Sequence, residues 1–268
     1  MLKIKEHLTS LKNPRIKNLM LLHKPRERRE QAVFIIEGLK EIEKANAAGY
    51  HFSEVYFCPD MIPEKQVEKL AGNAELCFTI GADLFEKLSY RGNSGGLIVV
   101  AQPKDHSLRK LTLKENPLLI VLESVEKPGN IGAILRTADA AGVDAVIVSN
   151  TKTDLYNPNV IRSSLGCLFT IPVLLGETTS VIDFLTKSRI PIYCTLLKAS
   201  VPYHTVDFKG PVAIVMGTES TGLTSVWLQH SHTNIIIPMH GAADSLNVST
   251  STAIVVFEAV RQRAAQKS

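Results

Sequence analysis

Six short and almost purely apolar runs in the second half of the sequence constrain the fold most strongly. Segments with a helical pattern separate them, so the chain alternates between strand and helix. Apolar runs without polar alternation are typical of strands that are buried on both faces of a parallel sheet. We therefore predict an α/β fold with strands at 118–124, 145–150, 171–175, 190–197, 212–217 and 234–239.

A ligand of such a sheet binds beyond the carboxyl ends of the strands. We therefore expect the chemistry of this half to lie in the loops at 124–132, 195–200, 217–222 and 239–247. A long last helix is predicted in the stretch "SLNVSTSTAIVVFEAVRQRAAQ".

The first half has a second, smaller α/β pattern. We predict basic helices in 13–24 and 26–38, further helices at 37–49, 64–72 and 82–89, and strands at 54–59, 75–80 and 96–102. The polar, proline-flanked stretch 103–117 is the predicted linker. The expected domains are thus 1–102 and 118–268, and both lie in the usual size range.

Composition favours a globular protein of the reducing cytosol. Of 268 residues, 45% are apolar and 21% are charged, and the longest apolar runs are far too short to span a bilayer. The first residues contain no apolar signal-peptide core. Four widely spaced cysteines argue against a disulfide framework or structural zinc, so we expect a cytoplasmic location. They are Cys58, Cys77, Cys167 and Cys194.

Positive charge is concentrated at the amino end. Residues 1–40 contain ten Lys or Arg and four Glu, a net charge of +6, whereas the whole chain carries +4. A basic end on a near-neutral body suggests a polyanionic partner. The alternative is a helix surface whose charges only face solvent.

Several ligand motifs are absent from the sequence. It has no G-x-x-x-x-G-K-[ST] phosphate loop, no G-x-G-x-x-G after a strand and no G-x-S-x-G elbow. His230 and His232 have no acidic or cysteine partner at ligand spacing, so we expect a surface turn and no metal there.

The loop "KPGNIGAILRT" leads into a helix of small and apolar residues. Asn130 is the predicted N-cap, and Gly129 and Gly132 allow a ligand to approach the backbone. Arg136 lies further along this apolar helix, where it suits a phosphate or carboxylate ligand. The alternative is a surface ion pair with Asp139, three residues on.

The stretch "VMGTESTGL" ends a buried strand. Gly217 and Gly222 bound a tight turn, and Glu219 between them lies where a ligand is expected. A carboxylate there is also explained by helix capping.

In the stretch 237–263, Pro238 ends a strand, Gly241 allows a turn, and Ser245 and Asn247 precede the last helix. An N-cap followed by a closely packed helix explains part of this pattern. The small hydroxyl residues that continue into the helix are Ser249, Thr250, Ser251 and Thr252.

Together the three stretches resemble the motifs of the SpoU/TrmH family, the RNA ribose 2′-O-methyltransferases of the SPOUT superfamily. The matching patterns are Asn130-x-Gly-Ala-x-x-Arg136, Gly217-x-Glu219-x-x-Gly222 and Pro238-Met-x-Gly241…Ser245-Leu-Asn247-Val-Ser249. Their order and spacing over about half of the chain are specific, although Ser220 stands where many members have glycine. The first half is similar to the RNA-binding domain of ribosomal-RNA and thiostrepton-resistance members.

The resemblance implies S-adenosylmethionine as cofactor, a deep trefoil knot in the catalytic domain and a homodimer. It assigns catalytic roles to Arg136, Asn130, Glu219, Ser245 and Asn247. It places the cofactor against Thr195, Leu196, Gly217, Gly222, Ile237, Met239 and Leu246. The candidate RNA contacts are Lys12, Arg15, Lys17, Arg26, Arg28 and Arg29.

Within the family, a separate amino-terminal domain favours 23S ribosomal RNA over transfer RNA as substrate. Two other hypotheses stay open on the sequence. One is an RNA-binding protein of this fold that has lost catalysis, and the other is an unrelated nucleotide-dependent enzyme with a doubly wound sheet.

Overall fold

The computed structural model describes residues 2–89, 95–197, 200–218 and 221–265. These residues form two compact units, each drawn from two stretches of the chain. Unit 1 contains residues 1–104 and 154–170, and unit 2 contains residues 105–153 and 171–268.

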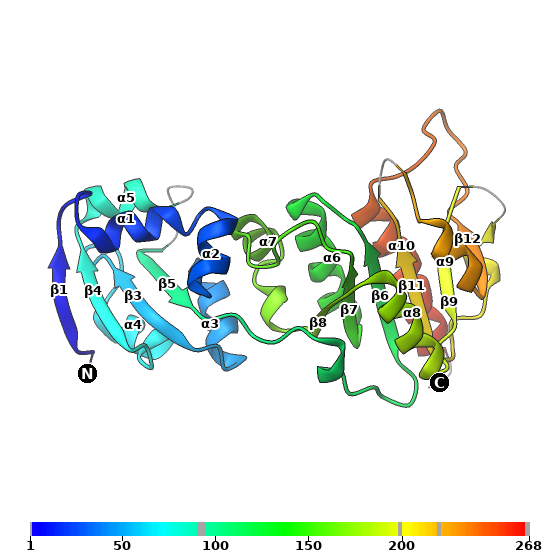
Figure 1. The fold of residues 1–268 in the computed structure, drawn as a ribbon, viewed down its shortest axis with the longest axis horizontal. Coiled ribbons are helices and arrows are strands. Elements are labelled where there is room, and N and C mark those ends of the chain that lie inside the picture. Colours follow the sequence, from blue (N-terminus) through cyan, green and yellow to red (C-terminus); the bar gives the residue numbers. More distant parts are fainter. Residues whose placement is uncertain (1, 90–94, 198–199, 219–220, 266–268) are drawn as a thin grey trace. The chain divides into compact units, whose positions relative to one another are not determined.

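Unit 1 is built around a mixed sheet with the strand order β1-β4-β3-β5-β2 (Figure 1). β1 and β3 run parallel to β4, whereas β5 is antiparallel to β3 and β2. Its elements are β1 (Ile4–Leu8), α1 (Pro14–Leu21), α2 (Pro25–Gln31), β2 (Phe34–Glu37), α3 (Leu39–Ala47), β3 (Phe52–Phe57), α4 (Glu64–Ala71), β4 (Leu76–Ile80), α5 (Ala82–Leu88), β5 (Leu97–Ala101), α7 (Pro158–Ser163) and η2 (Cys167–Phe169).

The region of β2 differs from the prediction, which extended a helix through Phe34–Glu37. α2 ends because Ala32 adopts a left-handed conformation at φ 50°, and Phe34–Glu37 pair with β5. A short apolar run such as 33–36 does not distinguish a helix turn from a strand, so the pairing partner decided the outcome.

The segment 154–170 belongs to unit 1 although it lies between two strands of the second sheet in the sequence. Tyr156 stacks on Phe34 with 4.0 Å between ring centroids, and Phe169 packs edge-on against Tyr50 at 4.9 Å. The contiguous division into 1–102, 103–117 and 118–268 therefore does not coincide with the compact units.

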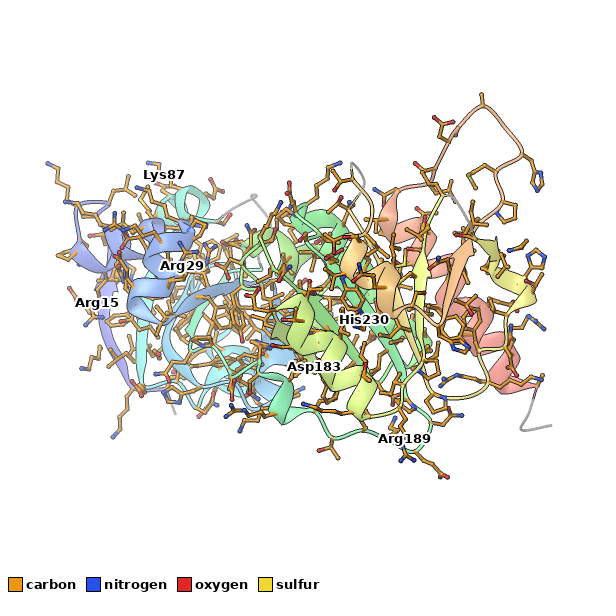
Figure 2. The ribbon with its side chains drawn as sticks, turned by 45° about the vertical axis from the view of Figure 1, so that its right-hand side comes forward. Arg15, Arg29, Lys87, Asp183, Arg189 and His230 are labelled. Atoms are coloured by element: carbon orange, nitrogen blue, oxygen red, sulfur yellow. The ribbon has the colours of Figure 1, made fainter. Side chains whose placement is uncertain are left out.

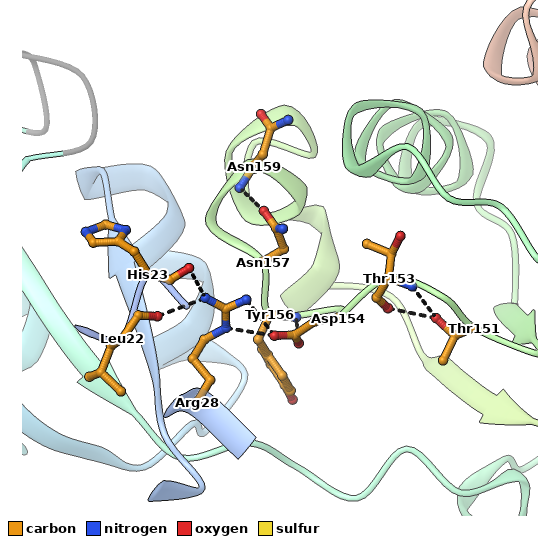
Figure 3. A network of polar contacts seen from close by, with 9 residues as sticks. All are labelled: Leu22, His23, Arg28, Thr151, Thr153, Asp154, Tyr156, Asn157 and Asn159. Atoms are coloured by element: carbon orange, nitrogen blue, oxygen red, sulfur yellow. Dashed lines mark hydrogen bonds and ion pairs between the residues drawn. The ribbon is translucent and has the colours of Figure 1, made fainter. Parts of the chain in front are cut away.

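A buried ion pair anchors the same segment within unit 1 (Figure 3). Arg28 Nε donates to Asp154 Oδ2 at 2.7 Å, and Nη1 donates to the carbonyl oxygens of Leu22 and His23 at 2.8 and 2.9 Å. The Arg28 side chain is only 3% exposed. A charge at such a position is stable only when it is paired and hydrogen-bonded, as it is here.

Unit 2 contains the predicted parallel sheet, with the order β10-β12-β9-β11-β6-β7-β8 and parallel pairing throughout. Helix α6 packs against α10, and α8 packs against α9. The elements are η1 (Leu108–Lys110), β6 (Leu118–Glu123), α6 (Pro128–Ala141), β7 (Ala145–Ser149), β8 (Val173–Gly176), α8 (Thr178–Lys187), β9 (Ile192–Thr195), β10 (Val201–Pro202), η3 (Tyr203–Thr205), β11 (Val212–Met216), α9 (Ser225–His230), β12 (Thr233–Ile236) and α10 (Val248–Ala264).

The strands β6, β7 and β11 are buried along their whole length, as the continuous apolar runs predicted. Residues from the predicted linker also join this unit. The Leu175 N–H donates to the His106 carbonyl oxygen at 2.7 Å, and Leu108, Leu111 and Leu113 pack against the core of the sheet.

Candidate active site

A cavity of about 590 Å³ lies beyond the carboxyl ends of β9, β11 and β12. All seven residues expected to contact a cofactor line it, together with Ser245. Three of the four loops singled out in the sequence thus meet at one pocket, where a parallel sheet binds its ligands. The remaining lining residues are Leu197, Met216, Thr218, Thr221, Leu223, Leu228, Asn234, Ile235, Ile236, Asp244, Val248, Ser251 and Val255.

The turn after β11 forms one wall of this pocket. Thr218 and Gly222 exchange backbone hydrogen bonds of 3.2 and 3.1 Å, and Gly222 adopts φ +69°. A Cβ atom on Gly217 would lie 2.6 Å from the Gly222 carbonyl oxygen. Glycine is therefore required at Gly217 by close backbone approach and favoured at Gly222 by its conformation.

A polar contact joins the first and third motifs. Asn247 Nδ2 donates to Asn130 Oδ1 at 3.2 Å. Asn247 is also the N-cap of α10, because its Oδ1 accepts from the Ser249 N–H at 2.9 Å. The predicted N-cap at Asn130 is wrong: α6 begins at Pro128 with Lys127 as N-cap, and Asn130 lies in its first turn.

Arg136 lies on α6 with an exposed side chain. Within the described ranges it forms no hydrogen bond and no ion pair, including the alternative pair with Asp139. The neighbours of Arg136 on the helix, Ile134 and Leu135, are buried. The guanidinium is therefore available to a ligand.

Of the two remaining predicted catalytic residues, the structure describes only Ser245. Ser245 lines the pocket and is exposed, directly before Leu246, which is 37% exposed. Glu219 lies outside the described residues.

The candidate RNA contacts other than Arg28 divide into exposed residues and residues in surface ion pairs. Lys12, Lys17 and Arg29 are exposed, and Figure 2 shows Arg15 and Arg29 on unit 1. Arg15 forms an ion pair with Glu54 at 2.6 Å, and Arg26 forms one with Glu30 at 2.6 Å. The side chains of Arg15 and Arg26 are 39% and 78% exposed.

The expectation for Arg28 is wrong. Its guanidinium is buried and occupied by Asp154 and two carbonyl oxygens, so it cannot reach a phosphate. An arginine in a basic run looks the same in the sequence whether it faces solvent or the interior.

The described part of the chain contains no cluster of His, Cys, Asp or Glu that could hold a metal ion. His230 Nδ1 lies 2.9 Å from the Val226 carbonyl oxygen, and the ring of His232 packs against Tyr193. No helix in residues 2–89, 95–197, 200–218 and 221–265 is long and apolar enough to cross a membrane.

Sequence reasoning missed Glu123, a fully buried carboxylate at the carboxyl end of β6. The signal was present, because an acidic residue closes the apolar run "LLIVLE". Its partners Thr178 and Thr224 are 55 and 101 residues away and carry no local pattern.

Comparison with known proteins gives two matches to family profiles. Residues 117–257 match the SpoU rRNA Methylase family, and residues 13–99 match the MRM3-like substrate binding domain. The chain is also similar to the 23S rRNA (guanosine(2553)-2′-O)-methyltransferase RlmP of Bacillus subtilis (strain 168). It is 29% identical over 252 residues, which cover 94% of this chain and 98% of the relative.

Solved structures agree in fold over nearly the whole chain. One is the crystal structure of an RNA 2′-O ribose methyltransferase whose sequence is 39% identical. Its TM-score is 0.84, and the match covers 96% of this chain and 99% of that chain. An AdoMet-bound rRNA methyltransferase from Sinorhizobium meliloti is 32% identical, with a TM-score of 0.86 and coverage of 96% and 98%. The chain therefore belongs to the SpoU rRNA methylase family.

Proposed function

We propose that this chain transfers a methyl group from S-adenosylmethionine to a ribose 2′-hydroxyl of 23S ribosomal RNA. The observation that carries the proposal is the single pocket formed by the predicted cofactor loops, beside the contact between Asn130 and Asn247. The relative RlmP, which matches 94% of this chain, supports the choice of RNA because it is named for 23S rRNA.

The pocket fits the cofactor in size and chemistry. Its volume of about 590 Å³ falls within the range usual for small-molecule sites. Apolar side chains such as Leu196, Ile237 and Leu246 suit an adenine ring, and Gly217, which packs closely on the Gly222 backbone, lines the same pocket. When bound, S-adenosylmethionine supplies the activated methyl group.

The remaining task of the protein is to position the acceptor ribose and to polarise its hydroxyl. Arg136 binds the phosphate next to the target ribose and polarises the 2′-hydroxyl. An arginine is not deprotonated in proteins, so we do not assign it the role of base. Its exposed position and its lack of a partner among the described residues support an RNA contact.

Asn130, Ser245 and Asn247 orient the ribose relative to the methyl donor in this proposal. Asn130 and Asn247 already contact each other at 3.2 Å, and Ser245 lines the cofactor pocket. Glu219 holds Asn130 or Arg136, a role that rests on the family resemblance alone.

We further propose a homodimer and a trefoil knot in unit 2, as the family resemblance implies. Phe257, which is 46% exposed on α10, supports a partner surface on that helix. A ribosomal RNA substrate would place the enzyme in the cytoplasm.

Unit 1 selects the RNA in this scheme. Lys12, Lys17 and Arg29 are the exposed candidates for phosphate contacts, and Arg15 and Arg26 are available after release of surface ion pairs. Such phosphate contacts supply affinity and make RNA binding depend on salt, but they add little sequence specificity. Arg28 is not included because it is buried.

The test is a transfer assay with labelled S-adenosylmethionine and unmodified 23S, 16S and transfer RNA, followed by mapping of the label. We expect a 2′-O-methylated nucleotide in 23S RNA, with the activity lost in Arg136→Ala. Arg109→Ala, a change of another exposed arginine in unit 2, is the matched control and should retain full activity.

Three outcomes would contradict parts of the proposal. Label on a base would exclude ribose chemistry, and label on transfer RNA would exclude the proposed substrate. Cofactor binding without transfer to any RNA would favour an RNA-binding protein that has lost catalysis.

A further inference from the structure

We propose that Glu123 is a positioning residue that fixes one wall of the cofactor pocket. The inference rests on the proposed function, because it treats this pocket as the site of S-adenosylmethionine. Glu123 does not line the pocket itself and acts through Thr224.

Glu123 is the last residue of the strand β6, and it is 1% exposed. β6 lies between β11 and β7, so the carboxylate is on an inner strand at the sheet's carboxyl edge. A buried carboxylate costs free energy unless it is hydrogen-bonded. Glu123 is absent from the ion pairs of the described residues, so hydrogen bonds hold it.

Two of these bonds come from Thr224. Its N–H donates to Glu123 Oε2 at 2.8 Å, and its hydroxyl donates to Oε1 at 2.8 Å. Thr224 follows Gly222 and Leu223, which line the pocket. The carboxylate therefore holds the chain where it leaves the pocket wall.

A third hydrogen bond to the carboxylate comes from Thr178. Thr178 Oγ1 donates to Glu123 Oε1 at 3.3 Å, and the same hydroxyl is 2.8 Å from Ser149 Oγ and 2.9 Å from Asn150 Nδ2. These groups lie at the end of β7 and the start of α8. Glu123 thus connects the turn after β11 to a fixed part of the sheet.

Among the described residues, hydrogen bonds to the sheet hold this turn at both ends, and Leu223 also packs in the core of the sheet. It begins at Met216, which is fixed by the pairing of β11 with β6, and it ends at Thr224. The backbone exchange between Thr218 and Gly222 joins the two sides of the turn. Loss of the bonds at Thr224 allows Gly222 and Leu223 to shift, and the pocket wall that they form shifts with them.

Thr224 is exposed to solvent, so water can replace the carboxylate as its hydrogen-bond partner. We therefore expect that removal of Glu123 affects the position of the turn more than the folding of unit 2. The measured quantity that responds is the affinity for S-adenosylmethionine.

The test compares Kd values for S-adenosylmethionine by calorimetry on the full chain, without RNA. We expect Glu123→Ala to raise the Kd about tenfold or more, consistent with loss of hydrogen bonds to a charged group. Glu123→Gln should stay within about twofold, because its oxygen can accept from the Thr224 N–H while its amide donates to the hydroxyls.

Asp144→Ala is the matched control. Asp144 Oδ2 accepts from the Leu118 N–H at 2.8 Å, so it braces the opposite end of the same strand. Asp144 is absent from the pocket lining, and we expect the Asp144→Ala variant to bind S-adenosylmethionine with the Kd of the wild type.

A folded Glu123→Ala variant with unchanged Kd overturns the inference, as does an equal effect of Asp144→Ala. If Glu123→Ala does not fold, Thr224→Val decides, since it removes only the hydroxyl bond. Thr224→Val should raise the Kd measurably, and an unchanged value overturns the inference. Wild-type protein that binds no S-adenosylmethionine would contradict the proposed function instead.

Discussion

The Asn247 amide donates a hydrogen bond to Asn130 Oδ1 at 3.2 Å, across 117 residues of sequence. The same side chain caps α10 through its other atom, since Oδ1 accepts from the Ser249 N–H and hydroxyl. Capping and contact with the first motif therefore use different atoms of one residue, and substitution can separate them.

Asn247→Asp should keep the cap and lose the donor. Aspartate is as good an N-cap as asparagine, so we expect thermal stability close to that of the wild type. The methyl-transfer rate should fall strongly, because the carboxylate repels Asn130 Oδ1. Parallel measurements of Tm and single-turnover rate check this expectation.

Asn247→Ala serves as the comparison and should lose both functions, with about 1 kcal/mol of stability lost with the cap. A normal rate in Asn247→Asp would show that the contact with Asn130 has no part in catalysis.

Gly217→Ala should weaken cofactor binding and destabilise unit 2 by about 1–3 kcal/mol, because the new methyl group meets the Gly222 backbone. Gly210→Ala is the control, since its Cβ would enter open space in the same unit, outside the pocket lining. We expect the control to be neutral or slightly stabilising. Chemical denaturation and cofactor titration of both variants test the difference.

Arg28→Ala should destabilise unit 1 by about 3–5 kcal/mol, because it leaves Asp154 without its buried partner. Arg26→Ala removes a surface pair on the same helix and should cost less than about 1 kcal/mol. Urea unfolding measures both values. Equal stability of the two variants would contradict the structural role assigned to Arg28.

Neutralising Lys12, Lys17 and Arg29 together should weaken RNA binding. The salt dependence of log K should also become shallower, by about one unit of slope or less per lost phosphate contact. The control changes Lys65 and Lys69, which are exposed on α4 of the same unit, to Gln. Titrations at several salt concentrations distinguish a lost contact from a general loss of positive charge.

Acid should destabilise unit 1 through His23. Burial, followed by the charge of Arg28, lowers the pKa of His23 below its ordinary value of 6.5. Below pH 6.5 the unfolded chain therefore binds a proton at His23 more readily than the folded chain does. The contribution of neutral His23 to the free energy of unfolding is thus present above pH 6.5 and is lost as the pH falls. His23→Gln should show a smaller decrease between pH 7.5 and pH 5.5 in urea unfolding.

The parallel sheet and a pocket beyond the carboxyl ends of its strands could both be predicted from the amino-acid sequence. Continuous apolar runs such as Leu118–Leu122 are typical of strands in a sheet that is covered on both faces, and these residues are buried. The three motifs could also be read directly, since each lies within a few residues along the chain. Their order and spacing along the chain were enough to indicate the family.

Features that depend on a distant partner could not be predicted in this way. Phe34–Glu37 became a strand because β5 lies beside it, and the residues of 154–170 joined unit 1 through aromatic contacts and Asp154. Arg28 was indistinguishable from Arg29 in the sequence, yet one is buried and the other exposed. Glu123 likewise gained its role only from hydroxyls 55 and 101 residues away. Local pattern fixes which face of an element is apolar, whereas the partner of a buried polar group depends on how the chain packs.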